Sequence, residues 1–520
     1  MPYAVRTLPA PLTFSLWAIA LLFVLNACDP GPIAIIDHDA FQQPGVGGGD
    51  VVGRGVLADG LAAPFDAGSL DSLFSADGDK DAAAQPPSTS LQQVYGGEFD
   101  EEAFDLVAFA DGGAVLAGTT ASMGAGDVDA LLIRTDACGA RLWARAYGTA
   151  GFDDARGVVA LAGGDLAVAG RTAGVGGDSD AWLMRTNATG TPKWSFRYGG
   201  PSDELAVDLA ALAGGGVVAV GSTFSEGPGT PKHDNLLVLR VDDLGAVLWA
   251  RTLGGTQNDS GFAVAAFKNS AGQNGGIVVA GASESAGAGN DDIWLISLEP
   301  DGNFLWSYVY GSPADDEARA VAFAPDGGFT VAGFTDGFGA TLSDAFALHV
   351  NAIGHVQWFA RYGGAKEERV YAVQPTPDGW AFAGRGDSFG GSDDGFLLVT
   401  NGKGTPTAWQ DLGAGHGDKI AAIATNSGGA LMLAGRNDSH GGGERDAWLV
   451  RTDAAGAVAC DSEVIGDAFV HAFKAIPRTL YVPPSVAKVP TRSVAAMKVT
   501  TVPGNASWSA SVCSAKGCEL

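Results

Sequence analysis

Carboxylate side chains recur at two fixed places in this sequence of 520 residues. The first set follows a short motif of Tyr or Leu before Gly: Asp100, Asp153, Asp203, Asp259, Asp315, Glu367 and Asp418. The second set opens an apolar segment: Asp129, Asp180, Asp234, Asp292, Asp344, Asp394 and Asp446. Clustered carboxylates suit calcium, but Asp also accepts backbone N–H groups in turns. We predict that both sets pin loops, with a calcium site or an acidic face for a basic partner as the alternative.

Residues for metal-dependent or nucleophilic catalysis are sparse. The histidines lack H-x-H or H-E-x-x-H spacing, and stand at His38, His233, His349, His355, His416, His440 and His471. Paired carboxylates such as Asp153 and Asp154 are adjacent, and adjacent residues of a strand point to opposite faces. We therefore predict no catalytic residue, no metal ligand set and no cofactor.

The first 27 residues have the order of an export signal. Arg6 precedes the apolar run 12–27, whose 16 residues are fewer than the about 20 that a membrane-spanning helix needs. The run ends in Leu25-Asn26-Ala27-Cys28, which resembles the bacterial lipobox. The resemblance implies that Cys28 carries acyl chains such as palmitate and anchors the protein to a membrane of the cell envelope. The outer membrane or the cell surface is the favoured location, and an ordinary signal peptide with an incidental cysteine is the alternative.

Residues 28–90 follow as the lipidated cysteine and a tether rich in Gly, Asp and Ala. A flexible chain of this length spans roughly 40 to 50 Å. Within it, Asp77-Gly78-Asp79-Lys80-Asp81 alternates carboxylates like a calcium loop, but Ala82 and Ser88 stand where an EF-hand has Gly and Glu. We expect a solvated linker here.

Composition limits the partners and the class of fold. The chain has 59 acidic and 31 basic residues, a formal charge of -28, so phosphate backbones are repelled and no nucleic acid is expected to bind. Its 77 glycines show no collagen period, which favours an all-β fold made of short strands and turns.

Residues 91–465 consist of consecutive copies of one sequence repeat. The residue before the opening glycine recurs at intervals of 50 to 57 residues: Tyr95, Tyr147, Tyr198, Leu253, Tyr310, Tyr362 and Leu412. Each copy holds four short apolar segments bounded by Gly, Asp or Asn, which is typical of β-strands. We predict a monomeric, seven-bladed β-propeller of four-stranded antiparallel blades, closed by residues 88–95. Eight blades are the alternative.

The last segment of most copies follows a D-x-x-G turn and carries Trp four residues after the Gly, as at Trp143, Trp194, Trp249, Trp306 and Trp358. We predict that these rings fill the wedge between blades. The phrase, with DAWLxR before it and YGG after it, resembles the repeats of bacterial extracytoplasmic β-propeller lipoproteins and, more distantly, the Trp-docking repeats of quinoprotein propellers. The resemblance implies the fold rather than a function. No vicinal cysteine pair supports a redox role.

Residues 466–520 differ from the repeats in charge, with six Lys or Arg against two acidic residues and a net charge of +4. We predict a strap lying on the propeller, with a degenerate eighth repeat as the alternative. Cys138, Cys460, Cys513 and Cys518 can pair in three ways. Cys460 with Cys513 is the preferred pair, and Cys513 with Cys518 is the local rival.

These features together predict a membrane-anchored, non-catalytic binding or scaffolding propeller at the bacterial cell envelope, for an unidentified protein or glycan ligand. The rival prediction is an exported enzyme that acts on polysaccharide, with its site in the loops of the acidic face.

Overall fold

The computed structural model describes residues 91–452 except 174–177, 226, 228–232, 269–273, 389–392, 414–416 and 439–444, together with the backbone of 512–514 and 517–518. The predicted signal peptide, Cys28, the tether with its Asp77–Asp81 loop, Cys460 and most of 466–520 lie outside these residues. No helix in the described part of the chain is long and apolar enough to cross a membrane.

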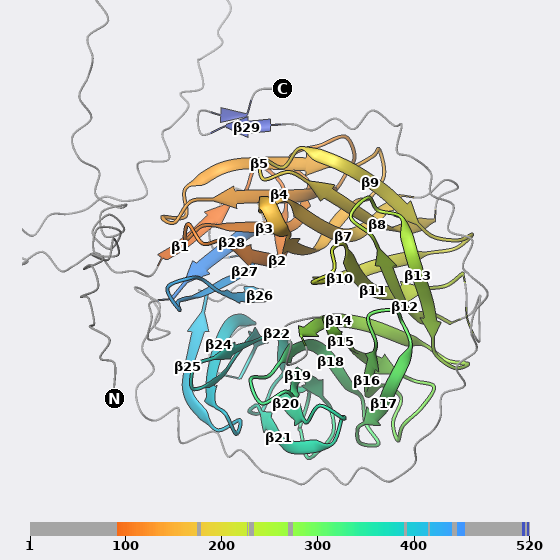
Figure 1. Cartoon of the computed structure of the whole chain (residues 1–520). Coiled ribbons are helices and arrows are strands. Elements are labelled where there is room, and N and C mark those ends of the chain that lie inside the picture. The colour runs from red at the N-terminus through yellow and green to blue at the C-terminus, as the bar shows by residue number, and fades with distance from the viewer. Residues whose placement is uncertain are drawn as a thin grey trace, which may run out of the picture. The chain divides into compact units, whose positions relative to one another are not determined.

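Seven antiparallel sheets of the repeat surround a central axis (Figure 1). The first four blades are β2 (Glu101–Ala108), β3 (Ala114–Thr120), β4 (Asp129–Thr135), β5 (Arg141–Tyr147); β6 (Asp154–Ala160), β7 (Leu166–Ala173), β8 (Ser179–Thr186), β9 (Pro192–Tyr198); β10 (Glu204–Ala211), β11 (Val217–Thr223), β12 (Asn235–Val241), β13 (Val247–Leu253); and β14 (Asp259–Lys268), β15 (Asn274–Ser283), β16 (Asp292–Leu298), β17 (Phe304–Tyr310). The other three are β18 (Asp316–Phe323), β19 (Phe329–Thr335), β20 (Asp344–Val350), β21 (Val356–Tyr362); β22 (Glu368–Thr376), β23 (Gly379–Gly386), β24 (Asp394–Asn401), β25 (Pro406–Leu412); and β26 (Lys419–Thr425), β27 (Leu431–Asn437), β28 (Asp446–Arg451) with β1 (Leu91–Tyr95). The predicted seven-bladed propeller is confirmed.

The ring closes because a strand from the N-terminal end of the repeat region completes the last blade. β1 forms the outer strand of the last blade and runs antiparallel to β28, with Leu91 opposite Arg451 and Tyr95 opposite Ala447. This confirms closure by the segment before Tyr95. Two short strands, β29 (Val512–Ser514) and β30 (Gly517–Cys518), extend the edge of the first blade beyond β5.

The hydrophobic core is divided among the junctions between blades. Seven clusters of buried side chains occur in the described chain, and each draws on two neighbouring sheets. The cluster around Trp182, for example, joins β3 and β4 to β6, β7 and β8. A sheet that is covered on both faces needs apolar side chains on both, which explains why strands such as β4, β12 and β16 are buried along their whole length.

A glycine in the second strand of every blade meets a bulge in the innermost strand. A Cβ at Gly118 would lie 1.8 Å from the carbonyl oxygen of Glu102, and the register of β2 on β3 shifts between Ala103 and Asp105. The same close approach occurs at Gly170, Gly221, Gly281, Gly333, Gly384 and Gly435. The glycine therefore accommodates a bulge of its own sheet, not the approach of a neighbouring blade.

Tyrosine hydroxyls connect each of five blades to the next one. The tyrosine that ends an outer strand donates to the carbonyl of the glycine in the following D-x-x-G or N-x-x-G turn, over 2.6 to 2.7 Å: Tyr95 to Gly139, Tyr147 to Gly190, Tyr198 to Gly245, Tyr310 to Gly354 and Tyr362 to Gly404. Leu253 and Leu412 lack the hydroxyl. We call this contact the tyrosine latch.

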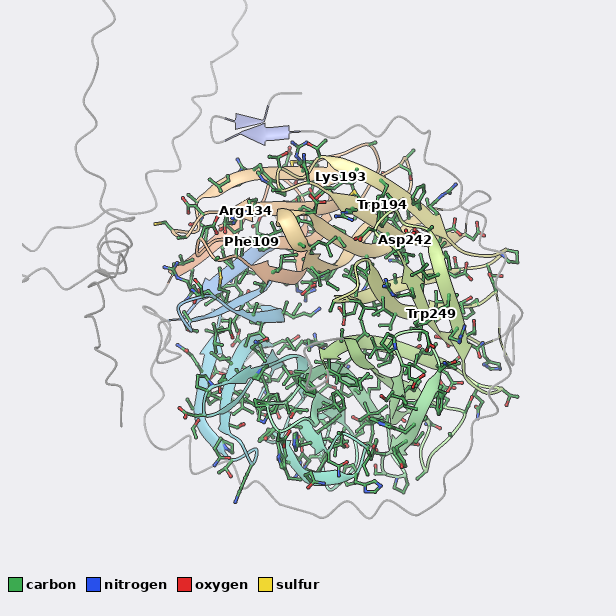
Figure 2. All side chains as sticks on the ribbon, in the orientation of Figure 1. Phe109, Arg134, Lys193, Trp194, Asp242 and Trp249 are labelled. Atoms are coloured by element: carbon green, nitrogen blue, oxygen red, sulfur yellow. The ribbon has the colours of Figure 1, made fainter. Side chains whose placement is uncertain are left out.

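The repeated tryptophans make a second contact with the same turns. The indole N–H groups of Trp194, Trp249 and Trp306 donate to backbone carbonyls in the next blade, over 2.9, 3.2 and 3.1 Å. The accepting carbonyls are those of Asp243, Pro300 and Ala352. Figure 2 shows Trp194 and Trp249 on the outer strands of neighbouring blades. Gly302 has φ of 81°, and a Cβ there would lie 2.8 Å from the Trp249 ring. The half-buried rings thus bridge neighbouring blades, while Trp182, Trp294 and Trp448 fill the deep core.

Removing one latch should weaken the whole ring. Tyr310→Phe keeps the ring packing but leaves the buried carbonyl of Gly354 without its donor, so the free energy of unfolding should fall by about 1 to 2 kcal/mol. Urea denaturation measures this change. Tyr308→Phe in the same strand is the control, because Tyr308 is not the latch tyrosine. Equal loss in both variants would contradict a specific role for the latch.

Candidate functional site

The predicted carboxylate positions lie at one end of the propeller, which we call the acidic loop face. It is formed by the loops that enter each innermost strand and the loops that join the second and third strands. Backbone bonds tie these loops together across blades, as from Asp153 N–H to Val128 O over 3.0 Å and from Glu368 N–H to Ser343 O over 2.7 Å. The two kinds of loop that carry the carboxylates therefore lie at the same end of the propeller.

In each blade one buried carboxylate lies at the position predicted for the first set or one residue after it, and in six blades it fastens the entering loop. The buried members are Glu101, Asp153, Glu204, Asp259, Asp316, Glu368 and Asp418, each at most 3% exposed. Each of the first six accepts the backbone N–H of the residue four positions earlier, for example Gly97 to Glu101 over 2.6 Å. Asp100, Asp203, Asp315 and Glu367, which the motif singled out, lie one residue earlier. The buried carboxylate lies four residues after the residue whose N–H it accepts, and this spacing is the sequence signal that would have identified it.

The second set holds the loop before the third strand. Asp292 accepts the N–H groups of Ala288 and Gly289 over 2.8 and 2.9 Å, and Asp129 accepts that of Gly126 over 3.0 Å. Asp180 lies 3.7 Å from Arg197, and Asp344 pairs with Arg361. Asp394 and Asp446 open β24 and β28 and are buried. In the third copy Asn235 opens β12, and Asp234 lies one residue before it and accepts the Ser260 hydroxyl over 2.6 Å.

The two sets meet at the blade junctions. A Cβ at Gly148 would lie 1.8 Å from Asp129 Oδ1 and 2.9 Å from Asp153 Oδ2, so a glycine is required between the two carboxylates. Burial raises the pKa of Asp129, and the charge of Asp153 raises it further. In the described residues no group of three or more His, Cys, Asp or Glu side chains is arranged to hold a metal ion. These carboxylates are used by the fold and are poor candidates for contact with a ligand.

Side chains further along the innermost strands form a network of cations on aromatic rings. The guanidinium of Arg156 lies 5.1 Å from the Phe104 ring, and that of Arg319 lies 4.0 Å from the Phe262 ring. Lys419 lies 4.8 Å from the Tyr371 ring, and its pKa is lowered mainly by burial. The sequence analysis missed this network. Its signal was the third residue after each buried carboxylate, which is aromatic or Arg in five copies.

A cavity of about 600 Å³ opens on the acidic loop face where the last, first and second blades meet. We name it the phenylalanine pocket after Phe99, Phe104 and Phe152, which line it together with Glu98, Asp100 and Arg445. Phe99 is 56% exposed and Phe152 is 44% exposed. Exposed rings beside carboxylates in a cavity of this size are typical of a ligand site.

A second cavity, of about 340 Å³, lies on the same face between the third, fourth and fifth blades. Phe224, Phe262, Asp291, Glu317 and Arg319 line it. Burial raises the pKa of Asp291 to about 6, and the charges of Glu317 and two other carboxylates contribute. In this second pocket the chain's own Arg319 covers the Phe262 ring and pairs with Glu317.

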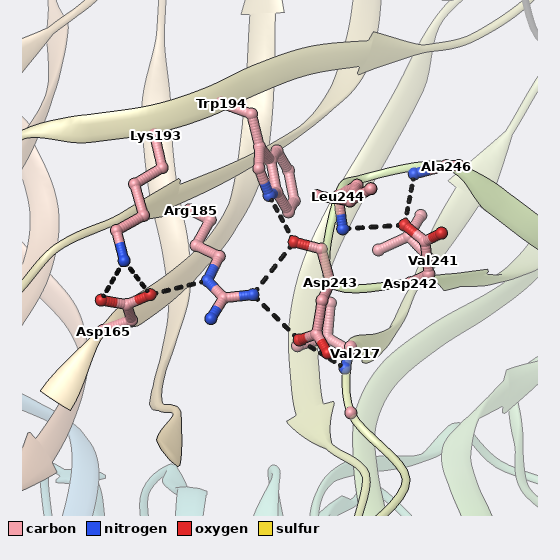
Figure 3. Close-up of polar contacts among 12 residues, drawn as sticks. Asp165, Arg185, Lys193, Trp194, Val217, Val241, Asp242, Asp243, Leu244 and Ala246 are labelled. Carbon is pink, nitrogen blue, oxygen red and sulfur yellow. Dashed lines mark hydrogen bonds and ion pairs between the residues drawn. The ribbon is translucent and has the colours of Figure 1, made fainter. Parts of the chain in front are cut away.

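A polar network at the opposite end joins the second blade to the third (Figure 3). Asp165 accepts from Lys193 over 2.6 Å and from Arg185 over 2.9 Å, and Arg185 continues to Asp243 over 2.9 Å. Burial alone would raise the pKa of Asp165, but the hydrogen bonds from Lys193 and Arg185 lower it. Because every charge in this network is paired, its role is to hold the blades together.

Two arrangements resemble catalytic motifs in their residue types but not in their structural setting. Thr330, His349 and Asp326 stand in the order of a nucleophile, base and acid, with distances of 2.9 and 3.0 Å, but Thr330 is fully buried. Gly386-Asp387-Ser388-Phe389-Gly390 has the spacing of a nucleophile elbow. Ser388, however, follows a strand that leads to β24 and not to a helix, and its hydroxyl accepts the Lys366 N–H.

Cys138 lies in the turn before β5 and is disulfide-bonded. Its partner side chain lies outside the described residues, as do the side chains of Cys460 and Cys513, so the predicted pair of those two cysteines stays a prediction.

Comparison with known proteins gives distant likenesses. No family model matches the chain. An alignment over 178 residues, which covers 29% of this chain, is 24% identical to the regulatory protein FlaEY of Caulobacter vibrioides, and it spans only 18% of that protein.

Solved structures resemble the chain at low similarity. The Pan2 WD40 domain of Neurospora crassa is 9% identical with a TM-score of 0.39, covering 69% of this chain and 98% of that one. A puromycin hydrolase, solved as the S511A mutant, is 14% identical with a TM-score of 0.43. The match covers 73% of this chain and 56% of the hydrolase. Likenesses this remote carry no argument about activity.

Asp105 and Asp208 directly follow the bulge of the innermost strands in the first and third blades. Asp105 accepts the N–H of Val158 in the next blade over 2.7 Å, and Asp208 accepts that of Val264 over 2.7 Å. Burial raises the pKa of Asp105 to about 8, with a contribution from the charge of Asp208. Asp105 therefore binds a proton more tightly in the folded state than in the unfolded chain, where the pKa of Asp is about 3.9.

This difference predicts a pH dependence of stability. The pKa of Asp105 is higher in the folded state than in the unfolded chain. Its contribution to the free energy of unfolding is therefore fully present below about pH 4 and is lost as the pH rises toward about 8. Asp105→Asn should remove the loss, so the variant should gain about 1 kcal/mol over the wild type between pH 5 and pH 8 in urea unfolding. Asp378→Asn, in an exposed turn, is the control. A gain that does not change with pH would contradict the assignment.

Proposed function

We propose that this protein is a lipid-anchored, non-catalytic binding propeller of the bacterial cell envelope, whose ligand occupies the phenylalanine pocket. One observation carries the proposal: Phe99 and Phe152 are exposed in a cavity of about 600 Å³. Exposing a large aromatic ring to water is unfavourable, so exposed rings grouped in a cavity are typical of a recognition site. The buried carboxylates nearby, such as Glu101 and Asp153, are engaged by loop N–H groups and are held by the fold.

The contacts of the described residues favour binding over catalysis. Glu101, at the base of the pocket, is occupied by Thr120 over 2.6 Å and Gly97 over 2.6 Å, so it is tied to the fold. The Thr330, His349 and Asp326 arrangement is closed to substrate by burial. The competing proposal, an exported enzyme that acts on polysaccharide, draws support from Glu98, Asp100 and Glu102, because paired carboxylates cleave glycosidic bonds.

The anchor is proposed from the sequence at Cys28, and the described chain enters the propeller at Leu91. β1 begins at Leu91 opposite Arg451, at the end of the strand away from the acidic loop face, and reaches that face at Tyr95.

Cys28→Ala should release the protein from membranes, because the acyl chains attach to that thiol. Fractionation of cells by ultracentrifugation, with detection in the pellet and supernatant, measures the release. A variant that stays in the pellet after a high-salt wash would show that the anchor lies elsewhere.

Saturable binding without turnover is the test of the binding role. The full-length protein in detergent is titrated with glycans and with peptides by calorimetry, and each mixture is analysed for products by mass spectrometry. We expect a bound ligand that is recovered unchanged and the same affinity in EDTA and in calcium. Hydrolysis of a polysaccharide would replace the proposal with the enzyme.

A further inference from the structure

We propose that the phenylalanine pocket recognises guanidinium or ammonium side chains of a basic polypeptide. The inference rests on the proposed binding function and specifies its ligand. It depends on three observations: carboxylates of the pocket that are outside the ion-pair network, rings that already carry cations elsewhere in the chain, and a lining with few neutral polar groups.

The charge of the pocket favours a cation. Glu98 and Asp100 make no ion pair with another described side chain, whereas Glu102 is neutralised by Lys419 at 3.2 Å. Arg445, the one basic residue of the lining, has its own partner in Asp438 at 3.9 Å. The whole chain carries -28, so the surrounding field attracts cations and speeds their approach.

The aromatic rings of this face are used for cations within the chain itself. The guanidinium of Arg171 lies 4.4 Å from the Phe152 ring, on a ring that remains 44% exposed. In the second pocket, Arg319 lies 4.0 Å from the Phe262 ring and pairs with Glu317. The equivalents of Phe262 and its neighbour in the phenylalanine pocket are Phe104 and Arg156. A ring beside a carboxylate is thus a combination that this fold repeatedly fills with a guanidinium.

The phenylalanine pocket differs from the second pocket in having the exposed ring of Phe99. No internal cation lies over Phe99 in the described residues, and the ring is 56% exposed beside Glu98 and Asp100. It offers a face that an incoming Arg or Lys side chain is able to cover. Arg is the better fit, because its planar group stacks on a ring and still donates to a carboxylate.

The lining argues against a neutral sugar. Sugar hydroxyls are usually met by amide, imidazole or hydroxyl groups, and the pocket contains no Asn, Gln, His, Trp or Tyr among its lining residues. Thr119 contributes its single hydroxyl. A basic polypeptide satisfies both the rings and the carboxylates, so it is the ligand class that the chemistry favours.

A charge-matched pair of peptides tests the inference on the full-length protein in detergent. The probe is an acetylated and amidated hexapeptide of alternating Gly and Arg, and its partner has citrulline, which is neutral and of the same shape, in place of Arg. Calorimetry at low and physiological salt gives the dissociation constants. We expect the Arg peptide to bind at least about tenfold more tightly than the citrulline peptide, and to weaken as salt rises.

Paired variants locate the binding. Phe99→Ala, Phe152→Ala and Asp100→Asn should each weaken binding of the Arg peptide about three- to tenfold. Phe304→Ala and Asp378→Asn are matched controls outside the pocket, with Phe304 42% exposed on β17, and should leave the affinity unchanged. Thermal unfolding of all five variants shows that each is folded.

The outcomes separate this inference from the binding function. Equal affinity for the two peptides, or equal loss in the control variants, overturns recognition of a basic side chain. A neutral glycan that binds saturably and is lost in Phe99→Ala overturns it too, while the binding function stands. Hydrolysis of a glycan in the same pocket would overturn both.

Discussion

The contact between an outer strand and the next blade's turn is the interaction on which the rest of the propeller depends. The glycine of each described D-x-x-G or N-x-x-G turn adopts positive φ, and in five of these turns its carbonyl accepts a tyrosine hydroxyl of the preceding blade. At Gly245, Gly354 and Gly404 a tryptophan ring of that blade also packs against the glycine. A single four-stranded sheet has two apolar faces and cannot bury either alone. The latches and the seven shared cores make the blades one cooperative unit, which β1 closes.

Charge is handled by the same junctions. A carboxylate from the third strand of one blade and one from the start of the next blade lie on either side of a glycine, as Asp344 and Glu368 do around Gly363. Two like charges in a buried site are unfavourable in themselves. Backbone N–H donors, hydroxyls and neighbouring Arg side chains offset the cost. The acidity of the chain is therefore partly structural, and only carboxylates outside these pairs are free to act on a ligand.

Function then depends on where the repeats differ from one another. The pinning carboxylates have an equivalent in every blade, whereas Phe99, Phe152 and Asp105 do not. The phenylalanine pocket forms where the last, first and second blades meet, and the second pocket forms between the third, fourth and fifth blades. A repeat fold keeps its packing residues in every copy and varies the loops at one face, which is how a symmetric ring acquires an individual site.

Sequence alone determined the architecture of this protein, because the copies of Tyr-Gly, Gly-Gly and D-x-x-G-x-x-x-W each encode a local requirement: a strand end, a turn with positive φ, and a ring that packs against the turn. It also located the two acidic sets to within one residue. Tertiary structure decided which of two adjacent side chains is buried, Glu101 instead of Asp100 and the amide of Asn235 instead of the carboxylate of Asp234. It also decided the pocket, because Phe99, Phe104, Phe152 and Arg445 meet only when the ring closes.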